Sequence, residues 1–264
     1  MSTETLPLIP SQIRSLIRDG KYNGVTGSLA PGYVQANVVI LPKEQAFDFL
    51  LFCQRNPRPC PMLEATEPGE FEPKLTSPTA DIRTDVSRYR VFRDGQLMDE
   101  VSNIENLWRE DLVTFLLGCS FTFESAIVEA GIPLWHWETG NNVTMYKTNI
   151  PTIPAGMFSG PMVVSMRPIH HKQIVRAVQV TSRFPGAHGA PVHIGNPSDI
   201  GIKDINNPDY GDRAEFDEGQ VPVFWACGVT PQAVALQSKP PFMITHAPGY
   251  MFITDMKDTD LAAL

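Results

Sequence analysis

The sequence predicts an α/β protein, and two observations lead to that prediction. Val34–Leu41 and Val221–Ala226 are rich in β-branched and apolar residues, which is typical of buried strands. Each half of the chain also shows a strand, a proline and a helix in that order, over 38–55 and again over 163–183. Strands that alternate with helices favour an α/β fold over an all-helical or all-strand one.

Helices are predicted where apolar residues recur at helical spacing between a cap and a breaker. Strands are predicted from short apolar runs, and the Asp94-Gly95 pair between two such runs predicts a hairpin. In the first half the expected elements are a helix over 11–20, a strand over 34–41, a helix over 42–55, the hairpin over 89–101, a helix over 107–116, a helix over 119–130 and a strand pair over 135–147.

The second half contains the same kinds of signal. Thr230-Pro231 is a helix start, because threonine caps a helix and proline suits its first turn. The expected elements are a strand over 162–166, a helix over 170–182, a strand over 221–226, a helix over 230–237, strands over 242–245 and 250–254, and a tail over the last nine residues.

The composition is that of a folded chain with unusually many prolines. Hydrophobic residues make up 42% and aromatic residues 9% of the 264 residues, which excludes a disordered chain. The 24 prolines are about 9% of the chain, against roughly 5% in average proteins. We treat 1–264 as one unit in which the halves 1–150 and 151–264 are candidate repeats.

Charge and cysteine usage limit the partners. The net charge of −8, with no long run of Lys or Arg, argues against a nucleic-acid partner. No stretch has the roughly 18–20 apolar residues of a membrane span, and the N-terminus lacks a leader pattern, so we expect a cytoplasmic protein. Its four cysteines form no CxxC pair and are expected to be free thiols. The sequence is compatible with a homo-oligomer.

Two cysteines stand at predicted helix entrances. Cys119 precedes Ser120 and Thr122, and Cys227 follows a predicted buried strand and precedes Gly228. A helix N-terminus offers free N–H groups and partial positive charge, which stabilise a thiolate or a bound oxyanion. The alternative is that both cysteines are small buried hydrophobic residues.

Four further residues could move protons. Glu124 lies in the first turn of a predicted helix, where it either complements the helix dipole or, if buried with a raised pKa, acts as an acid. His188 and His193 share a glycine-rich loop, and His246 lies between two predicted strands. Histidine transfers protons near neutral pH, although the loop histidines could also be incidental.

Charged residues near the prolines of 57–78 could bind a carboxylate. Asp81, Arg83 and Asp85 alternate, so an extended chain places them on one face, either in a polar cleft or in a salt-bridge cluster. Arg58 lies between prolines and could bind a carboxylate or pair with Glu64. His136, between two tryptophans, is expected in the core or stacked on an aromatic ring.

No nucleotide-binding, hydrolase or zinc-peptidase motif occurs in the chain. GxxxxGK[ST], GxGxxG after a strand, GxSxG and HExxH are all missing. This disfavours ATP-driven chemistry, nicotinamide cofactors, serine-hydrolase triads and zinc peptidases, and we expect no cofactor.

Six segments in the same order resemble the D-glutamate cyclase family, a group of bacterial proteins labelled as hydro-lyases. These are 56–61 (NPRPCP), 81–85 (DIRTD), 118–124 (GCSFTFE), 183–193 (RFPGAHGAPVH), 221–230 (VPVFWACGVT) and 245–249 (THAPG). The resemblance implies a mixed-sheet three-layer α/β sandwich with a smaller α+β subdomain. It also implies closure of D-glutamate to 5-oxo-D-proline with loss of water. It assigns no catalytic residues.

That chemistry needs a proton acceptor, a proton donor, oxyanion donors and a cation for the α-carboxylate, and no nucleotide. The partner is then a small carboxylate or amino acid. Two alternatives remain: a racemase or epimerase that uses the two cysteines directly, and a carboxylate-binding protein without catalysis.

Overall fold

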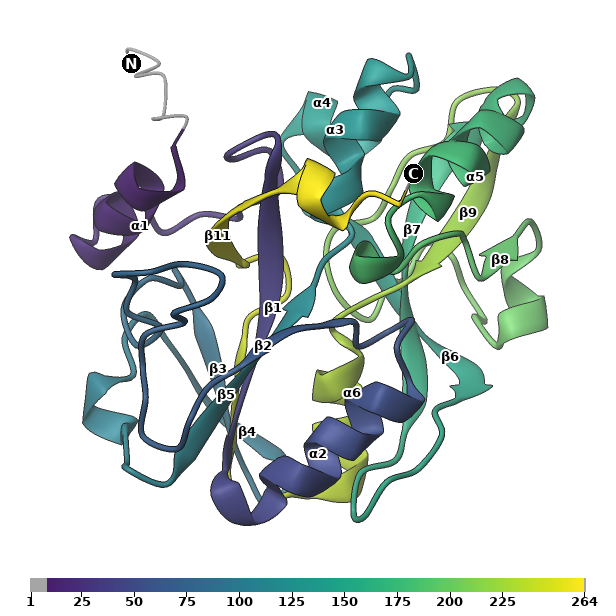
Figure 1. Ribbon diagram of the computed structural model, residues 1–264. Coiled ribbons are helices and arrows are strands. Elements are labelled where there is room, and N and C mark those ends of the chain that lie inside the picture. The colour runs from purple at the N-terminus through teal and green to yellow at the C-terminus, as the bar shows by residue number, and fades with distance from the viewer. Residues whose placement is uncertain (1–8, 264) are drawn as a thin grey trace.

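The computed structural model describes residues 9–263, which form two β-sheets with helices packed against them (Figure 1). The larger sheet has seven strands in the order β2-β5-β1-β10-β3-β4, and β11 also pairs with β1. Its strands are β1 (Tyr33–Pro42), β2 (Met62–Ala65), β3 (Tyr89–Arg93), β4 (Gln96–Val101), β5 (Leu112–Gly118), β10 (Met243–His246) and β11 (Phe252–Lys257). The smaller sheet has the order β6-β7-β9-β8, with β6 (Thr144–Pro151), β7 (Pro161–His170), β8 (His193–Ile194) and β9 (Gln220–Ala226).

The helices pack on both sheets, which confirms the predicted α/β class. They are α1 (Pro10–Arg18), α2 (Lys43–Arg55), α3 (Phe121–Glu129), α4 (Trp135–Thr139), α5 (Ile174–Ser182) and α6 (Thr230–Ser238). On the larger sheet, Phe49 of α2 and Val234 of α6 share a core cluster with Val39 of β1. On the smaller sheet, Phe123 of α3 packs against Trp225 of β9, with ring centroids 5.8 Å apart. Among residues 9–263, none of the helices has the length and apolar character needed to cross a membrane.

Helices α2 and α5 connect strands that run in the same direction. β1 and β2 both pair antiparallel with β5, and β7 and β8 both pair antiparallel with β9. The resemblance implies a mixed sheet, yet every pairing among the described strands is antiparallel. The reason is that β5 and β9 are each inserted between the two strands that a helix connects.

The helix predicted over 107–116 is wrong. Leu112–Gly118 forms strand β5, and only Glu105–Leu107 forms a short 3-10 turn before it. All seven residues of β5 are buried, because the strand lies between β1 and β2 and is covered on both faces. A strand buried on both faces has no alternation of polar and apolar residues, so its apolar residues also match helical spacing.

The strand pair predicted over 135–147 is also wrong in its first part. Trp135–Thr139 is the short helix α4, and the following strand β6 pairs with β7. Gly140 has a φ of +71° and ends this helix in the left-handed conformation. The Gly140-Asn141 pair therefore ends a helix. Ending a helix and forming a hairpin turn are both common roles of glycine.

The other predicted elements occur within a few residues of their expected positions, including the hairpin of β3 and β4. The proline-rich segment 57–78 contains the short strand β2. The predicted tail is structured in part, because β11 extends to Lys257 and Asp258–Leu261 forms a 3-10 turn.

The two halves of the chain contain elements in a corresponding order. In the first half β1, α2, β2, β5 and α3 follow one another, with β3 and β4 added, and the sheet order is β2-β5-β1. In the second half β7, α5, β8, β9 and α6 follow one another, and the sheet order is β8-β9-β7. Strand β6, which follows α4, pairs with β7. Strand β10, which follows α6, pairs with β1. Duplication of the halves 1–150 and 151–264 stays a prediction.

Candidate active site

A buried ion pair joins the smaller sheet to helix α3. Arg167 on β7 is 1% exposed and Glu124 on α3 is fully buried. The Nε of Arg167 donates to Oε1 of Glu124 at 3.0 Å, and Nη2 donates to the same oxygen. Nη2 also donates to Ser120 Oγ at 2.9 Å, and Nη1 donates to Ser165 Oγ at 3.0 Å. Since a guanidinium has five N–H bonds, one N–H of Nη1 has no partner among the described residues.

Glu124 stays ionised in this environment. His136 Nε2 lies 2.9 Å from Oε1, and the indole N–H of Trp137 donates to Oε2 at 2.6 Å. Burial alone would raise the pKa of Glu124, but His136 and Arg167 outweigh burial and lower this pKa to about 2. A lowered pKa does not fit the role of an acid with a raised pKa, and the hydrogen bonds of Glu124 instead hold Arg167 in place.

The sequence reasoning missed Arg167. The sequence predicts a strand only over 162–166, because Pro168 follows closely. In the structure β7 continues through this proline to His170, and Arg167 is part of the strand. A single arginine in an otherwise apolar strand is the signal that could have found it. Such a charge is buried only when it is paired, and buried paired charges often mark functional sites.

Cys119 and Cys227 lie between a strand and a helix, as predicted, and each is 6% exposed. Burial raises the pKa of both thiols, to about 11 for Cys227, so both are protonated at neutral pH. The charge of Arg167 and the backbone N–H groups of Phe121 and Val229 act in the opposite direction. Both cysteines belong to one apolar cluster that also contains Met145 of β6.

The side chain of Asn37 on β1 touches both cysteine turns. Its Nδ2 donates to the carbonyl oxygen of Gly118 at 2.7 Å, directly before Cys119. A Cβ atom at Gly228, directly after Cys227, would lie 1.9 Å from the same Nδ2. Glycine at 228 is therefore what allows the two turns to approach one amide.

His188 presents an unpartnered ring nitrogen. Its Nδ1 lies 2.6 Å from the carbonyl oxygen of Arg58, and because a carbonyl only accepts, Nδ1 carries the proton. Nε2 therefore has a lone pair, and it is buried without a partner among the described residues. Burial, with a smaller effect from Arg167, lowers the pKa of His188 to about 4, so the ring is neutral at pH 7.

His246 presents the opposite tautomer. Its Nδ1 lies 3.1 Å from the backbone N–H of Val38 and 3.4 Å from the carbonyl oxygen of the same residue, and the shorter contact favours a neutral ring with its proton on Nε2. Within residues 9–263 this Nε2 also lacks a hydrogen-bond partner, and burial lowers the pKa of His246 to about 4. The hydroxyl of Tyr210 is a third buried group without a partner in the described chain. Burial raises the pKa of Tyr210 to about 12, with a further increase from the charge of Asp209.

The structure thus brings seven of the predicted residues near Arg167 or against Asn37 and strand β1. We call this set the Arg167 cluster; it comprises Cys119, Ser120, Glu124, Arg167, His188, Cys227, Gly228 and His246 with Asn37. The cluster contains the buried cation of Arg167, a lone pair on His188 Nε2 and an N–H on His246 Nε2. The N-termini of α3 and α6 lie next to its cysteines.

The charged residues of 81–85 are occupied elsewhere. The guanidinium of Arg83 donates to both carboxylate oxygens of Asp81, at 2.9 and 2.7 Å, and stacks on the ring of Phe71. Asp85 is fully buried and accepts two hydrogen bonds from Arg18 of α1. These contacts match the salt-bridge alternative, so the structure does not bring these residues into the Arg167 cluster.

The remaining candidates have local partners. Arg58 is exposed and donates to the carbonyl oxygen of Ala190 at 3.4 Å. His193 lies 2.8 Å from the carbonyl oxygen of Asn196, and Thr122 accepts from a backbone N–H of β1 at 3.4 Å. His136 is buried and its ring stacks on Phe121 with centroids 6.3 Å apart, which confirms its predicted place.

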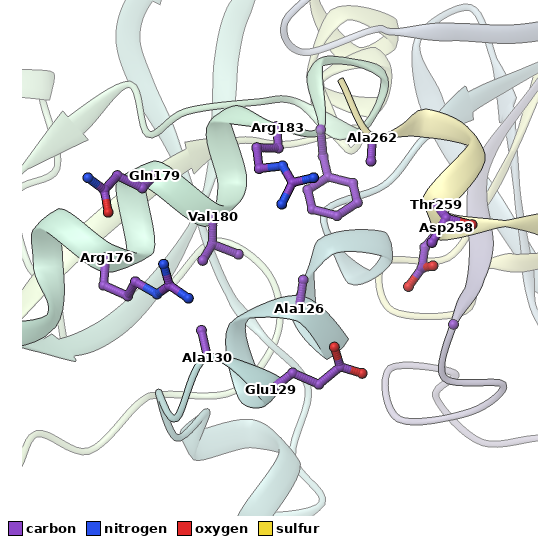
Figure 2. A pocket seen from close by; sticks show the side chains of 12 residues that line it. Ala126, Glu129, Ala130, Arg176, Gln179, Val180, Arg183, Asp258, Thr259 and Ala262 are labelled. Atoms are coloured by element: carbon purple, nitrogen blue, oxygen red, sulfur yellow. The ribbon is translucent and has the colours of Figure 1, made fainter. Parts of the chain in front are cut away.

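A surface pocket of about 530 Å³ lies apart from the cluster, between α3, α5 and the C-terminal segment (Figure 2). Arg176, Gln179 and Arg183 line one side of it and Glu129 and Asp258 line another. None of the candidate residues named above lines this pocket. Among the described residues, no group of three or more His, Cys, Asp and Glu side chains could hold a metal ion.

Comparison with known proteins supplies the family. Residues 113–255 match the family model described as D-glutamate cyclase. A protein of Geobacillus kaustophilus named "Putative hydro-lyase GK2103" is 60% identical over 262 residues, which cover 99% of this chain and 100% of the relative. "Putative hydro-lyase YcsI" of Bacillus subtilis is 58% identical over 257 residues, with 97% and 100% covered.

Among solved structures, a nitrogen repressor-like protein from Methanococcus jannaschii aligns with a TM-score of 0.37 and 11% identity, over 90% of this chain and 91% of that one. A TM-score this low carries no argument about fold or function. The matched residues 113–255 include most of the Arg167 cluster, and the relatives align over nearly their whole length. The chain therefore belongs to the D-glutamate cyclase family.

Proposed function

We propose that this enzyme closes D-glutamate, or a similar amino acid with a second carboxylate, to 5-oxo-D-proline with loss of water. The family supports a hydro-lyase reaction. The observation that carries the proposal is the Arg167 cluster, which contains a buried guanidinium with one unused N–H and two buried histidines whose Nε2 atoms have no partner within residues 9–263. Buried polar atoms without partners are uncommon in proteins and are expected where a polar ligand binds.

Arg167 is the group that would hold the α-carboxylate of the substrate. Its charge is balanced by Glu124, which fixes the guanidinium through Nε and Nη2 and leaves one N–H of Nη1 free. A charge-assisted hydrogen bond from a fixed, buried guanidinium is strong, because little ordering entropy is lost when the anion binds.

The two histidines fit the proton transfers of the reaction. In lactam closure the amine nitrogen bonds to the γ-carboxyl carbon, one carboxylate oxygen departs, and two protons pass from the ammonium group to form water. The lone pair on Nε2 of His188 can accept one proton from the ammonium group and return it to the departing oxygen, and the Nε2–H of His246 can hydrogen-bond to that oxygen while the second ammonium proton passes to it directly. Their opposite tautomers are set by the backbone, so neither has to rearrange first.

The helix N-termini after Cys119 and Cys227 provide donors for the oxyanion of the tetrahedral intermediate. The N–H groups of Thr122 and Thr230 already bond to the cysteine carbonyls, so the candidate donors are the backbone N–H groups directly after the two cysteines, those of Ser120 and Gly228. Donors that are fixed before the reaction stabilise developing negative charge most effectively. No nucleotide is needed in this scheme, since the carboxylate is protonated and not phosphorylated.

The test is direct. Purified protein is incubated with D-glutamate without ATP, and 5-oxo-D-proline is separated by chiral chromatography. The proposal predicts product above the slow spontaneous background, and hydrolysis of 5-oxo-D-proline in the reverse direction. Absence of turnover in both directions refutes the proposal.

A further inference from the structure

The two cysteines of the Arg167 cluster occupy corresponding positions in the two halves of the chain. In the larger sheet Ala36 of β1 pairs with Gly118 of β5, and Cys119 follows directly. In the smaller sheet Val164 of β7 pairs with Ala226 of β9, and Cys227 follows directly. Each cysteine thus leaves a central strand at the same register relative to the strand that begins its half.

The hydrogen bonds after each cysteine correspond as well. The third residue after each cysteine is a threonine whose N–H bonds to the cysteine carbonyl, at 3.1 Å for Thr122 and 3.0 Å for Thr230. The Thr122 hydroxyl accepts from the N–H of Gln35, and the Thr230 hydroxyl accepts from the N–H of Val163. Gln35 and Val163 are the residues directly before the paired positions on β1 and β7.

The two sulfur atoms also have matching surroundings. In each case the backbone N–H two residues later, that of Phe121 for Cys119 and that of Val229 for Cys227, acts to lower the pKa of the thiol. Such N–H groups at a helix start favour the thiolate form of a cysteine. Cys119 and Cys227 therefore lie in the same local structure, one in each half of the chain.

Both thiols belong to one site. Asn37 contacts the turn before Cys119 and the turn after Cys227, and the two cysteines pack in one cluster. The Arg167 cluster also contains His188 and His246, which are only 2% and 1% exposed and have no partner at Nε2 within the described chain, as expected where a polar ligand binds.

We propose that Cys119 and Cys227 exchange the α-hydrogen of the bound amino acid from opposite faces, which gives the protein an amino-acid racemase activity besides ring closure. Because the two cysteine turns occupy corresponding positions in the two halves and share Asn37, we place the two thiols on opposite sides of the bound α-carbon. In the active form one of the two thiols has first lost its proton to solvent. This thiolate takes the α-proton, and the electron pair of the broken C–H bond moves into the α-carboxylate. The other thiol then donates its proton to the opposite face and becomes the thiolate, so atoms and charge balance without a cofactor.

Arg167 makes this step feasible. The charge on the α-carboxylate increases as the proton leaves, and a buried guanidinium stabilises that increase more than it stabilises the bound substrate. The racemase proposal depends on the proposed function in one respect only: the substrate is an amino acid whose α-carboxylate binds at Arg167.

The experiment follows both activities in one sample. Full-length protein is incubated in heavy water with D-glutamate or L-glutamate, loss of the α-hydrogen signal is followed by proton NMR, and 5-oxoproline and both glutamate enantiomers are separated by chiral chromatography. Cys119→Ala and Cys227→Ala are compared with Cys53→Ala, a matched change of a buried cysteine in the core of α2. Cys119→Ser and Cys227→Ser replace the alanine variants if either of those fails to fold.

The wild type and Cys53→Ala are expected to exchange the α-hydrogen of both enantiomers and to interconvert them. Each active-site variant should lose interconversion by at least about 100-fold and should exchange at most one enantiomer, a different one in each variant. Absence of exchange in the folded wild type overturns the inference, as does interconversion at the wild-type rate in both variants. Exchange without 5-oxoproline refutes ring closure alone, and 5-oxoproline without exchange refutes the racemase activity alone.

Discussion

The carboxylate of Glu124 accepts two hydrogen bonds from the guanidinium of Arg167 in a place where both side chains are at most 1% exposed. The two residues come from different elements, α3 and β7. A pair of this kind costs desolvation energy, so its main effect is to fix the orientation of the arginine.

Replacement of Glu124 by glutamine is expected to lower the free energy of unfolding by about 3–5 kcal/mol, because the charge of Arg167 is left buried without its counter-ion. Urea denaturation at pH 7 measures this loss. Glu129→Gln, an exposed site on the same helix, should stay within about 0.5 kcal/mol of the wild type. Equal stability of the two variants would show that the ion pair does not hold Arg167.

Glu124 should also make the protein sensitive to strong acid. Its pKa is lowered to about 2 in the folded state, so the unfolded chain binds a proton more readily. The stabilisation is present above the ordinary pKa near 4.5, amounts to about 3 kcal/mol, and is lost as the pH falls toward 2. Glu124→Gln should remove this part of the pH dependence, and a difference between wild type and variant that stays constant from pH 5 to pH 2 contradicts the assignment.

The two buried histidines predict a second loss of stability at milder pH. Burial lowers the pKa of His188 and of His246 to about 4, whereas an unfolded histidine has a pKa near 6.5. The unfolded state therefore binds more protons below pH 6.5, and stability should fall between pH 6.5 and pH 4 by about 3 kcal/mol for each histidine. Denaturation midpoints across this range measure the slope.

His188→Asn is the variant that tests this assignment. Asparagine tolerates the φ of +79° at this position and keeps a donor that can reach the Arg58 carbonyl. The variant should show about half of the wild-type pH dependence, while His193→Asn, at a half-exposed site in the same loop, should show all of it. An unchanged slope in His188→Asn would mean that this ring does not titrate as described.

Gly228→Ala should disturb the approach of the two cysteine turns. The added methyl group would meet Nδ2 of Asn37, so the hydrogen bond from this amide to the Gly118 carbonyl must break. A buried carbonyl left without a donor costs about 1–3 kcal/mol. Thermal or urea unfolding measures the loss, and Gly27→Ala, where a methyl group meets only ordinary contacts with Phe121, should be nearly neutral.

A double-mutant cycle separates this clash from a general effect at residue 228. In an Asn37→Ala background the methyl group has room, so Gly228→Ala should cost clearly less than it does in the wild type. Strictly additive losses would place the effect of Gly228 elsewhere.

The cysteines could be placed from the sequence because their signals are local. An apolar run, a cysteine and a helix start follow one another within about ten residues, and the structure keeps that order at Cys119 and Cys227. The hairpin at Asp94-Gly95 is local in the same sense. By contrast, the sequence predicts a helix where β5 lies. Burial of this strand on both faces removes the alternation of polar and apolar residues that marks a strand.

The centre of the site could not be predicted, because it depends on contacts between distant residues. Arg167 meets Glu124 only after β7 and α3 are placed together, and His188 takes its tautomer from the carbonyl of Arg58. Spacing in the sequence contains no record of such contacts. It instead drew attention to Arg83 and Asp81, which lie two residues apart and bind each other.

The comparison of Arg167→Lys with Arg83→Lys tests the central claim most directly. Formation of 5-oxo-D-proline from D-glutamate is measured for both variants, together with their thermal unfolding. Lysine keeps the charge but cannot hold Glu124, Ser120 and Ser165 while also binding a carboxylate. The account predicts a loss in kcat/KM of at least about 100-fold for folded Arg167→Lys and wild-type turnover for Arg83→Lys. Wild-type turnover by Arg167→Lys, or a comparable loss in Arg83→Lys alone, would contradict it.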